Sequence, residues 1–162
     1  MDLKTALKKL IPIQHTYRAL HLKKKFSLHN FLTETYSGDG EDIVLKSIFK
    51  NKKEGFYVDV GAFHPKYISN THLLHKRGWH GINIDPNSDT IELFKKYRPH
   101  DINLNFGINS EEVFLEYYNF THSGVNTFDK EHAESKTNSN GNKLIDVKKI
   151  NAYHLKQSLK NI

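Results

Sequence analysis

The chain has 162 residues, which is enough for one domain with its own hydrophobic core but not for two. Its formal net charge is +6, yet seven of the basic residues fall among the first 25 residues beside a single aspartate, so the charge does not indicate nucleic-acid binding. Cysteine is absent, no apolar run approaches the roughly 20 residues of a membrane span, and the start of the chain lacks the apolar segment of a signal peptide, so we expect a cytoplasmic protein without stable membrane insertion.

Residues 1–30 predict a basic helical extension. Leucine and alanine side chains share one face of a helix between residues 3 and 10, and Pro12 ends that helix. Two interpretations remain open: the extension packs loosely on the domain, or it contacts an acidic membrane surface or partner. Residues 31–162 are predicted to form the main domain.

A second helix follows the Gly-rich polar turn at residues 36–42. Glu41 and Asp42 occupy its first turn, where carboxylates interact favourably with the helix dipole. We expect its buried face to contain Ile43, Val44, Ile48 and Phe49.

The aromatic and β-branched run Phe56–Val60 predicts a parallel strand that is buried on both faces and stops at Gly61. Asp59 interrupts the run, and burying a carboxylate is costly unless it is paired or hydrogen-bonded. Two roles are open for Asp59, and they are compatible with each other. It accepts hydrogen bonds from the amides of the turn, or it meets the ammonium group of a bound ligand.

Ser69 is expected to cap a helix that runs to Arg77 and ends at Gly78. A second strand, residues 81–84, then ends at Asp85. A strand, a glycine turn, a helix and a second strand with a terminal carboxylate form the arrangement that binds adenosine-bearing cofactors, in which the carboxylate accepts hydrogen bonds from ribose hydroxyls.

The turn after the first strand has one glycine, Gly61, where a dinucleotide site has three in the pattern G-x-G-x-x-G. The residues that follow it, from Ala62 to Pro65, leave little room for a pyrophosphate but suit S-adenosyl-L-methionine, which carries no phosphate. The spacing alone leaves another nucleoside ligand open. Asn70 and Thr71, at the start of the predicted helix, are expected to face the same crevice as Gly61.

Ser88 is expected to cap the next helix, which Pro99 breaks and whose buried stripe contains Ile91, Phe94 and Tyr97. A third strand follows at residues 102–106. Phe106 and Gly107, at the end of that strand, are predicted either to flank an adenine ring or to belong to the ordinary core.

The last part of the chain has a different pattern. Val113–Phe120 alternates as an antiparallel strand does, and residues 121–142 predict a long polar loop that is either functional, as a cover over a substrate, or disordered. Residues 143–150 predict another strand, and residues 152–160 a short final helix.

Histidines offer one candidate base and one candidate metal site. His64 either shapes the loop before Pro65 or acts as a general base, because a neutral imidazole can accept a proton from a substrate hydroxyl. His72, His75 and His80 lack the glutamate of the His-Glu-x-x-His pattern and have no cysteine nearby, so we predict no metal site.

Five segments together resemble one known family. They are Tyr-Ser-Gly-Asp-Gly-Glu-Asp (36–42), Gly-Phe-Tyr-Val-Asp-Val-Gly-Ala-Phe-His-Pro (55–65), Ser-Asn-Thr (69–71), Gly-Trp-His-Gly-Ile-Asn-Ile-Asp-Pro (78–86) and Arg-Pro-His-Asp-Ile-Asn-Leu-Asn-Phe-Gly-Ile (98–108). In this order they are similar to the FkbM-type family of S-adenosylmethionine-dependent methyltransferases. The segment Ser-Gly-Val-Asn-Thr (123–127) also resembles that family. The family has Ser-Gln before Gly-Glu-Asp, where this chain has Ser37, Gly38 and Asp39.

The resemblance implies an α/β, Rossmann-like methyltransferase fold with a mostly parallel sheet, flanking helices and S-adenosyl-L-methionine as cofactor. The acceptor that it implies is a hydroxyl on a sugar, a glycan precursor or another small molecule. His64 is the candidate catalytic residue. The candidate cofactor-binding residues, from spacing and resemblance together, are Glu41, Asp59, Gly61, Ala62, Asn70, Thr71, Asp85, Phe106 and Gly107.

Members of this family continue with a further central strand that ends in an Asp-Val-Glu-Gly type motif, whereas this sequence stops at Ile162. We therefore expect a C-terminally truncated domain, whose open sheet edge pairs with a partner chain or self-associates. Two alternatives remain: a non-catalytic nucleoside-binding or interaction remnant, and half of a nicotinamide-dependent oxidoreductase, which the single-glycine turn disfavours.

Overall fold

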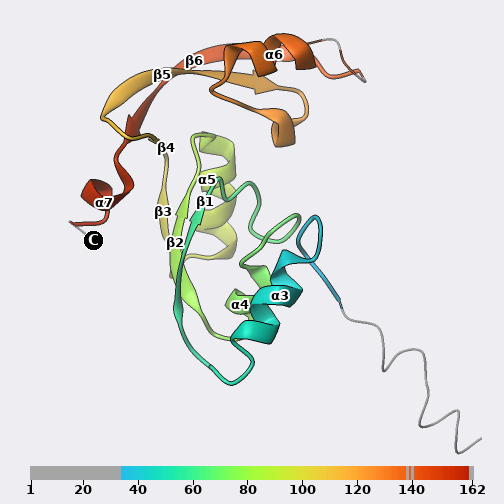
Figure 1. Cartoon of the computed structure of the whole chain (residues 1–162), viewed down its shortest axis with the longest axis vertical. Coiled ribbons are helices and arrows are strands. Elements are labelled where there is room, and N and C mark those ends of the chain that lie inside the picture. Colours follow the sequence, from blue (N-terminus) through green and yellow to red (C-terminus); the bar gives the residue numbers. More distant parts are fainter. Residues whose placement is uncertain (1–33, 138, 140, 161–162) are drawn as a thin grey trace, which may run out of the picture. The chain divides into compact units, whose positions relative to one another are not determined.

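The computed structural model describes residues 34–137, 139 and 141–160. The chain divides into two units, Met1–Glu34 and Thr35–Ile162, and only the second is described below (Figure 1). The basic extension predicted at residues 1–30 lies outside the described residues. Within the described part of the chain, no helix combines the length and apolar character needed to cross a membrane.

The first sheet is parallel and has the strand order β1-β2-β3. Its strands are β1 (Phe56–Val60), β2 (His80–Ile84) and β3 (Ile102–Leu104). In the register of the sheet, Val58 lies beside Ile82, and Ile82 lies beside Ile102. The third strand is shorter than predicted, because it ends two residues before Phe106.

Three helices lie on one side of this sheet (Figure 1). They are α3 (Glu41–Ile48), α4 (His72–Lys76) and α5 (Ser88–Tyr97). Because α4 joins β1 to β2 and α5 joins β2 to β3, the chain alternates strands and helices as parallel α/β folds do. The expected α/β class, with a parallel sheet and flanking helices, is confirmed.

A small hydrophobic cluster holds α3 and α4 against β1. Its buried members are Tyr57, Leu74 and Trp79, and Leu45 and Phe49 of the α3 segment pack against them. Leu45 and Phe49 are four residues apart and therefore share a helix face.

The predicted apolar face of α3 is thus partly wrong. Val44 and Ile48 are 59% and 66% exposed. The residue that α3 buries completely is Asp42, which accepts hydrogen bonds from the Thr35 hydroxyl and the Tyr36 N–H, both at 2.7 Å. Asp42 therefore fixes the preceding turn, beyond any interaction with the helix dipole.

The prediction that β1 is buried on both faces is wrong. Phe56, Val58 and Val60 are 53%, 41% and 49% exposed. Side chains alternate along a strand, so these three point away from the helices that Tyr57 contacts. β1 is also an edge strand, and among the described residues no strand pairs with its free edge. The free edge of β1 is an open sheet edge of the kind expected from the sequence.

Two predicted helix caps lie one or two residues from the real ones. The cap of α4 is Thr71 rather than Ser69, whose hydroxyl instead accepts a hydrogen bond from Arg98 at 3.0 Å. The cap of α5 is Asn87 rather than Ser88, because the Asn87 side chain accepts from the N–H of Asp89 at 3.0 Å.

The buried side of α5 differs from the predicted stripe at its end. Ile91 and Phe94 are buried as expected, and Thr90 joins them, but Tyr97 is 41% exposed. The next residue, Arg98, is almost fully buried at 1% exposure. The buried side chain at this end of α5 is therefore that of Arg98 and not, as predicted, that of Tyr97.

The second sheet has the order β4-β6-β5 and is mixed. Its strands are β4 (Gly107–Ile108), β5 (Val113–Phe120) and β6 (Leu144–Tyr153), with β4 parallel and β5 antiparallel to β6. The antiparallel strand predicted at 113–120 is confirmed. β6 continues to Tyr153, so the final helix α7 (Leu155–Ser158) is shorter than predicted.

Between β5 and β6, the described residues form more secondary structure than the predicted polar loop. They contain the 3₁₀ helix η2 (Ser123–Val125) and the helix α6 (Lys130–Lys136). Ala133 of α6 is buried with Tyr118 and Phe120 of β5. A helix with a single buried apolar residue has almost no periodic signal, which is why the sequence pattern missed it.

Candidate functional site

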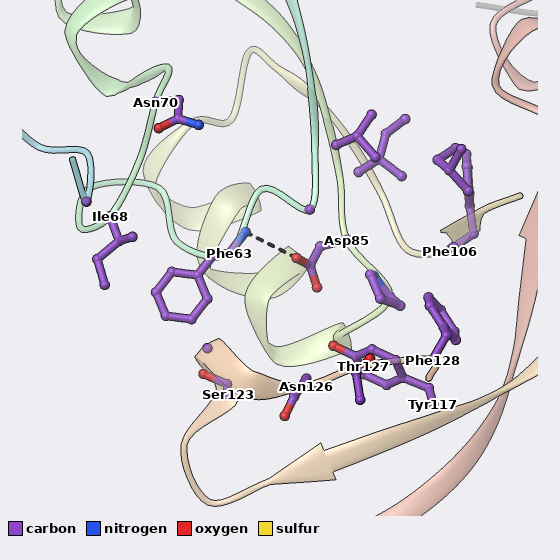
Figure 2. Close-up of a pocket in the computed structure, with 18 of the residues that line it drawn as sticks. Phe63, Ile68, Asn70, Asp85, Phe106, Tyr117, Ser123, Asn126, Thr127 and Phe128 are labelled. Carbon is purple, nitrogen blue, oxygen red and sulfur yellow. Dashed lines mark hydrogen bonds between the residues drawn. The ribbon is translucent and has the colours of Figure 1, made fainter. Parts of the chain in front are cut away.

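A cavity of about 690 Å³ opens where β1 and β2 end (Figure 2). The chain ends of the two strands contribute Val60, Gly61, Ile84 and Asp85 to its wall. Ligands of open parallel sheets bind at this carboxyl edge, so the position agrees with the crevice predicted from the sequence.

The turn after β1 uses its own amides to tie the strands together. The N–H groups of Gly61 and Ala62 donate to the Ile84 carbonyl at 2.9 and 3.2 Å. Gly61 has a φ of 70°, which favours glycine. Gly61 lines the cavity, but Ala62 is buried and does not, so the candidate role of Ala62 becomes that of a structural strand clamp.

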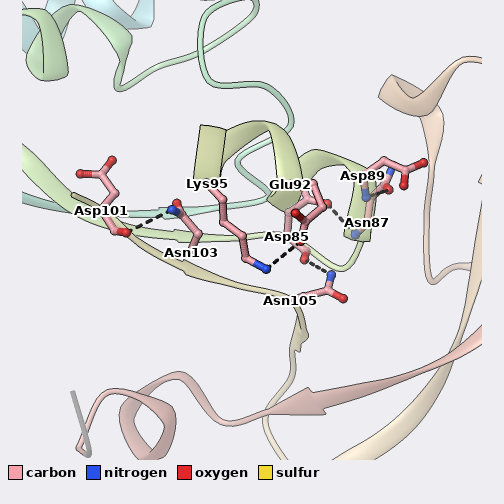
Figure 3. A network of polar contacts seen from close by, with 8 residues as sticks. All are labelled: Asp85, Asn87, Asp89, Glu92, Lys95, Asp101, Asn103 and Asn105. Carbon is pink, nitrogen blue, oxygen red and sulfur yellow. Dashed lines mark hydrogen bonds and ion pairs between the residues drawn. The ribbon is translucent and has the colours of Figure 1, made fainter. Parts of the chain in front are cut away.

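Asp85 lies at the centre of the cavity wall (Figure 2). One carboxylate oxygen accepts from the Phe63 N–H at 3.1 Å, and the other accepts from the Asn87 N–H at 2.8 Å. Burial raises the pKa of Asp85, and these two bonds oppose that effect. The Asn105 amide donates to the Asp85 carbonyl (Figure 3) and to the Pro86 carbonyl, both at 2.9 Å, which fixes the end of β2.

One end of the cavity is acidic. Asp39, Glu41 and Asn70 line it, together with Ile68. Glu41 accepts a hydrogen bond from the Asp39 N–H at 3.0 Å. Hydrogen bonds from backbone N–H groups, first its own and then that of Asp39, lower the pKa of Glu41. None of the described residues that line the cavity is a lysine or an arginine.

The other end of the cavity is aromatic. Phe106, Tyr117 and Phe128 lie beyond Asp85 in Figure 2, and the rings of Tyr117 and Phe128 are 4.9 Å apart. Burial, the largest cause, raises the pKa of Tyr117 to about 12, so its phenol stays neutral at physiological pH. A side chain at Gly107 would place its Cβ 2.7 Å from the Phe128 ring, so glycine permits this close approach.

Six candidate cofactor-binding residues therefore meet around one cavity, and three do not line it. The six are Glu41, Gly61, Asn70, Asp85, Phe106 and Gly107. Sequence reasoning missed Tyr117 and Phe128, because they come from the second sheet and its loop. The only available signal was the family-like segment at 123–127, which precedes Phe128 directly.

Asp59 and Thr71 belong to a buried network instead of the cavity wall. The Thr71 hydroxyl donates to Asp59 at 2.7 Å and accepts from the Arg98 guanidinium at 2.8 Å. Burial raises the pKa of Asp59, and Thr71 and Arg98 oppose that effect. Two expectations are therefore wrong. Thr71 does not face the crevice, and the hydrogen-bond donor to Asp59 is the Thr71 hydroxyl rather than the amides of the turn.

Arg98 is the centre of this network, and sequence reasoning assigned it no role. Its guanidinium donates to the Thr71 and Ser69 hydroxyls, to the Tyr57 phenol at 3.3 Å and to the Pro65 carbonyl. These partners come from β1 and from the segment between β1 and α4. Arg98 therefore fixes that segment to the end of α5.

His64 has a geometry that suits loop shaping better than catalysis. Its Nδ1 accepts from the N–H groups of Lys66 and Tyr67 at 3.0 and 3.1 Å, so the proton of the neutral ring lies on Nε2. Burial lowers the pKa of His64, so the ring is neutral. The free nitrogen is then a donor, which argues against a general base. His64 also lines a separate cavity of about 330 Å³ rather than the one at Asp85.

The charges and rings that line the cavity suit a particular kind of ligand. It can hold a molecule with an aromatic group at one end, hydroxyl donors in the middle and a positive charge at the other end. Among the described residues, no group of three His, Cys, Asp or Glu side chains is placed to hold a metal ion. Comparisons with protein-family models, with curated proteins and with solved structures found no match to this chain.

Proposed function

We propose that this chain binds S-adenosyl-L-methionine in the Asp85 cavity. We propose further that it is a Rossmann-like methyltransferase that acts on a hydroxyl of a small molecule such as a sugar or glycan precursor. The family-like segments support this proposal, and so does the position of the cavity at the carboxyl edge of a parallel sheet.

The charge of the cavity is the observation that carries the proposal. Asp39, Glu41 and Asp85 line it without a single lysine or arginine among the described lining residues. S-adenosylmethionine carries a sulfonium, an ammonium and one carboxylate, so its net charge is positive. The two phosphates of NAD would instead face three carboxylates, which argues against an oxidoreductase half.

The two ends of the cavity fit the two ends of the cofactor. An adenine ring suits the aromatic end at Phe106, Tyr117 and Phe128, and the ammonium group suits the acidic end at Asp39 and Glu41.

Asp85 suits the ribose between these ends. Each of its oxygens accepts one N–H bond, and a carboxylate oxygen has capacity for about two, so ribose hydroxyls can use the remainder. The volume of about 690 Å³ lies within the range of about 300–1,000 Å³ typical of ligand pockets.

The chemistry asks little of the protein beyond orientation. When bound, the cofactor supplies a methyl group that its sulfonium already makes electrophilic. The residues of this chain bind the cofactor through Asp85 and the aromatic end and hold it in one orientation. Such positioning of the reactants lowers the entropic part of the barrier.

Calorimetric titration of the full chain with S-adenosylhomocysteine tests the proposal. We expect saturable binding, and Asp85→Ala should weaken it by about tenfold or more, because bonds to a charged group contribute about 1.5–3 kcal/mol each. Asp89→Ala is the matched control variant, since Asp89 is exposed and does not line this cavity. NAD should not bind.

Absence of S-adenosylhomocysteine binding by a folded chain would refute the proposal, and so would tighter binding of NAD. Binding of S-adenosylhomocysteine no tighter than that of adenosine, without methyl transfer to any of a panel of sugars, would support the nucleoside-binding alternative.

A further inference from the structure

The loop between β1 and α4 contains two residues in an unusual backbone conformation. Phe63 has a φ of 52° and Ile68 a φ of 49°, both in the left-handed region. Few residues other than glycine adopt this region, and for a β-branched side chain such as Ile68 it is a genuine outlier. Both residues line the Asp85 cavity. Strained residues of this kind cluster at ligand-binding sites.

Hydrogen bonds from outside and within the loop hold these conformations. Arg98 donates to the Pro65 carbonyl and the Ser69 hydroxyl, and the Ser69 N–H donates to the Tyr36 carbonyl at 2.8 Å. Within the loop, His64 Nδ1 accepts two backbone N–H bonds. These tethers lie on both sides of Ile68, so the loop cannot relax at that position without breaking them.

Burial does not compensate the strain at Ile68. Ile68 is 60% exposed. It lies beside Gly38, where an added Cβ would be 3.7 Å from the Ile68 side chain. The Phe63 ring lies beside Gly124, with a corresponding distance of 3.6 Å. Ile68 therefore lies at the acidic end of the cavity, next to the turn that contains Asp39, whereas Phe63 lies between Asp85 and Gly124.

We propose that Ile68 is a specificity-determining residue that recognises the aliphatic chain between the nucleoside and the ammonium group of the ligand. This inference rests on the proposed function. In Figure 2, Ile68 and Asn70 lie on one side of Asp85, and Phe106, Tyr117 and Phe128 on the other. A ligand that extends from the aromatic end to the acidic end covers Ile68, whereas a nucleoside alone ends at Asp85.

Two substitutions separate the apolar contact from the backbone strain. Ile68→Asn removes the apolar contact and relieves the strain, because asparagine tolerates the left-handed region. Ile68→Val is the matched control, because it keeps both the β-branch and most of the apolar surface. Calorimetry with S-adenosylhomocysteine and with adenosine, and thermal unfolding of each full-length variant, give the readouts.

We expect Ile68→Asn to weaken S-adenosylhomocysteine binding by about tenfold, because this change in affinity corresponds to the free energy of burying roughly half of an isoleucine side chain. Adenosine binding should stay within about twofold, because Ile68 lies beyond the reach of a nucleoside at Asp85. The Tm of Ile68→Asn should exceed that of the wild type. Ile68→Val should match the wild type in all three measurements.

Three results would overturn the inference while leaving the proposed function intact. They are unchanged S-adenosylhomocysteine binding in Ile68→Asn, equal weakening of both ligands, and a Tm of Ile68→Asn below that of the wild type. Failure of the wild-type chain to bind S-adenosylhomocysteine would instead refute the proposed function, and the inference with it.

Discussion

Replacing Arg98 with lysine tests whether the buried network holds the domain together. The guanidinium has four hydrogen-bond partners, to which it donates from two different nitrogens, and it is only 1% exposed. A lysine keeps the charge but has one nitrogen, so it cannot reach both pairs of partners. Two lost charge-assisted bonds at about 1.5 kcal/mol each destabilise the fold by about 3 kcal/mol.

Urea unfolding followed by circular dichroism measures this loss. Lys95→Met is the control on the same helix, because Lys95 forms an exposed ion pair with Glu92 and its removal should change stability by no more than about 0.5 kcal/mol. A loss for Arg98→Lys as small as that of the control would show that the interior network contributes little, and the reasoning about the tethered loop would fall with it.

Two further predictions concern Asp59 and the open edge of β1. Burial raises the pKa of Asp59 in the folded chain, so folding favours the protonated carboxyl. The stability that this protonated group contributes is present below the ordinary aspartate pKa of about 3.9. It is lost as the pH rises through the raised pKa of the folded chain. Asp59→Asn should reduce this loss between pH 4 and pH 7 in urea unfolding; an unchanged pH dependence would contradict the assignment. At β1, the half-exposed Val58 on an edge strand should promote association, so Val58→Lys should shift the chain toward the monomer in light scattering after gel filtration. A wild-type chain that is already monomeric at high concentration would contradict this.

The sequence predicted well the elements whose signal is local. β-branched runs with glycine punctuation located the first two strands, and the terminal carboxylate of β2, Asp85, does line a cavity at the carboxyl edge of the sheet. These features depend on alternation and chain order, which a single sequence contains.

Features that depend on partners distant in the chain were not predictable in this way. Ser69 is a good helix cap by residue type, but Arg98, which is 29 residues away, takes its hydroxyl. Thr71 was expected to face the crevice for the same local reason, but its hydroxyl donates a hydrogen bond to Asp59 instead. The prediction that β1 is buried on both faces failed because a continuous apolar run does not show whether helices cover both faces of the sheet.

The clamp formed by the Gly61 and Ala62 amides has a consequence for how the site can change. In phosphate-binding folds the backbone donors of this turn face the ligand, so the preference for an anion is part of the fold itself. Here those donors are occupied by the Ile84 carbonyl. On the proposed function, selection by charge is left to side chains such as Asp39 and Glu41, which single substitutions can replace without altering the path of the main chain. The proposed ligand preference and the fold are therefore separable traits in this protein.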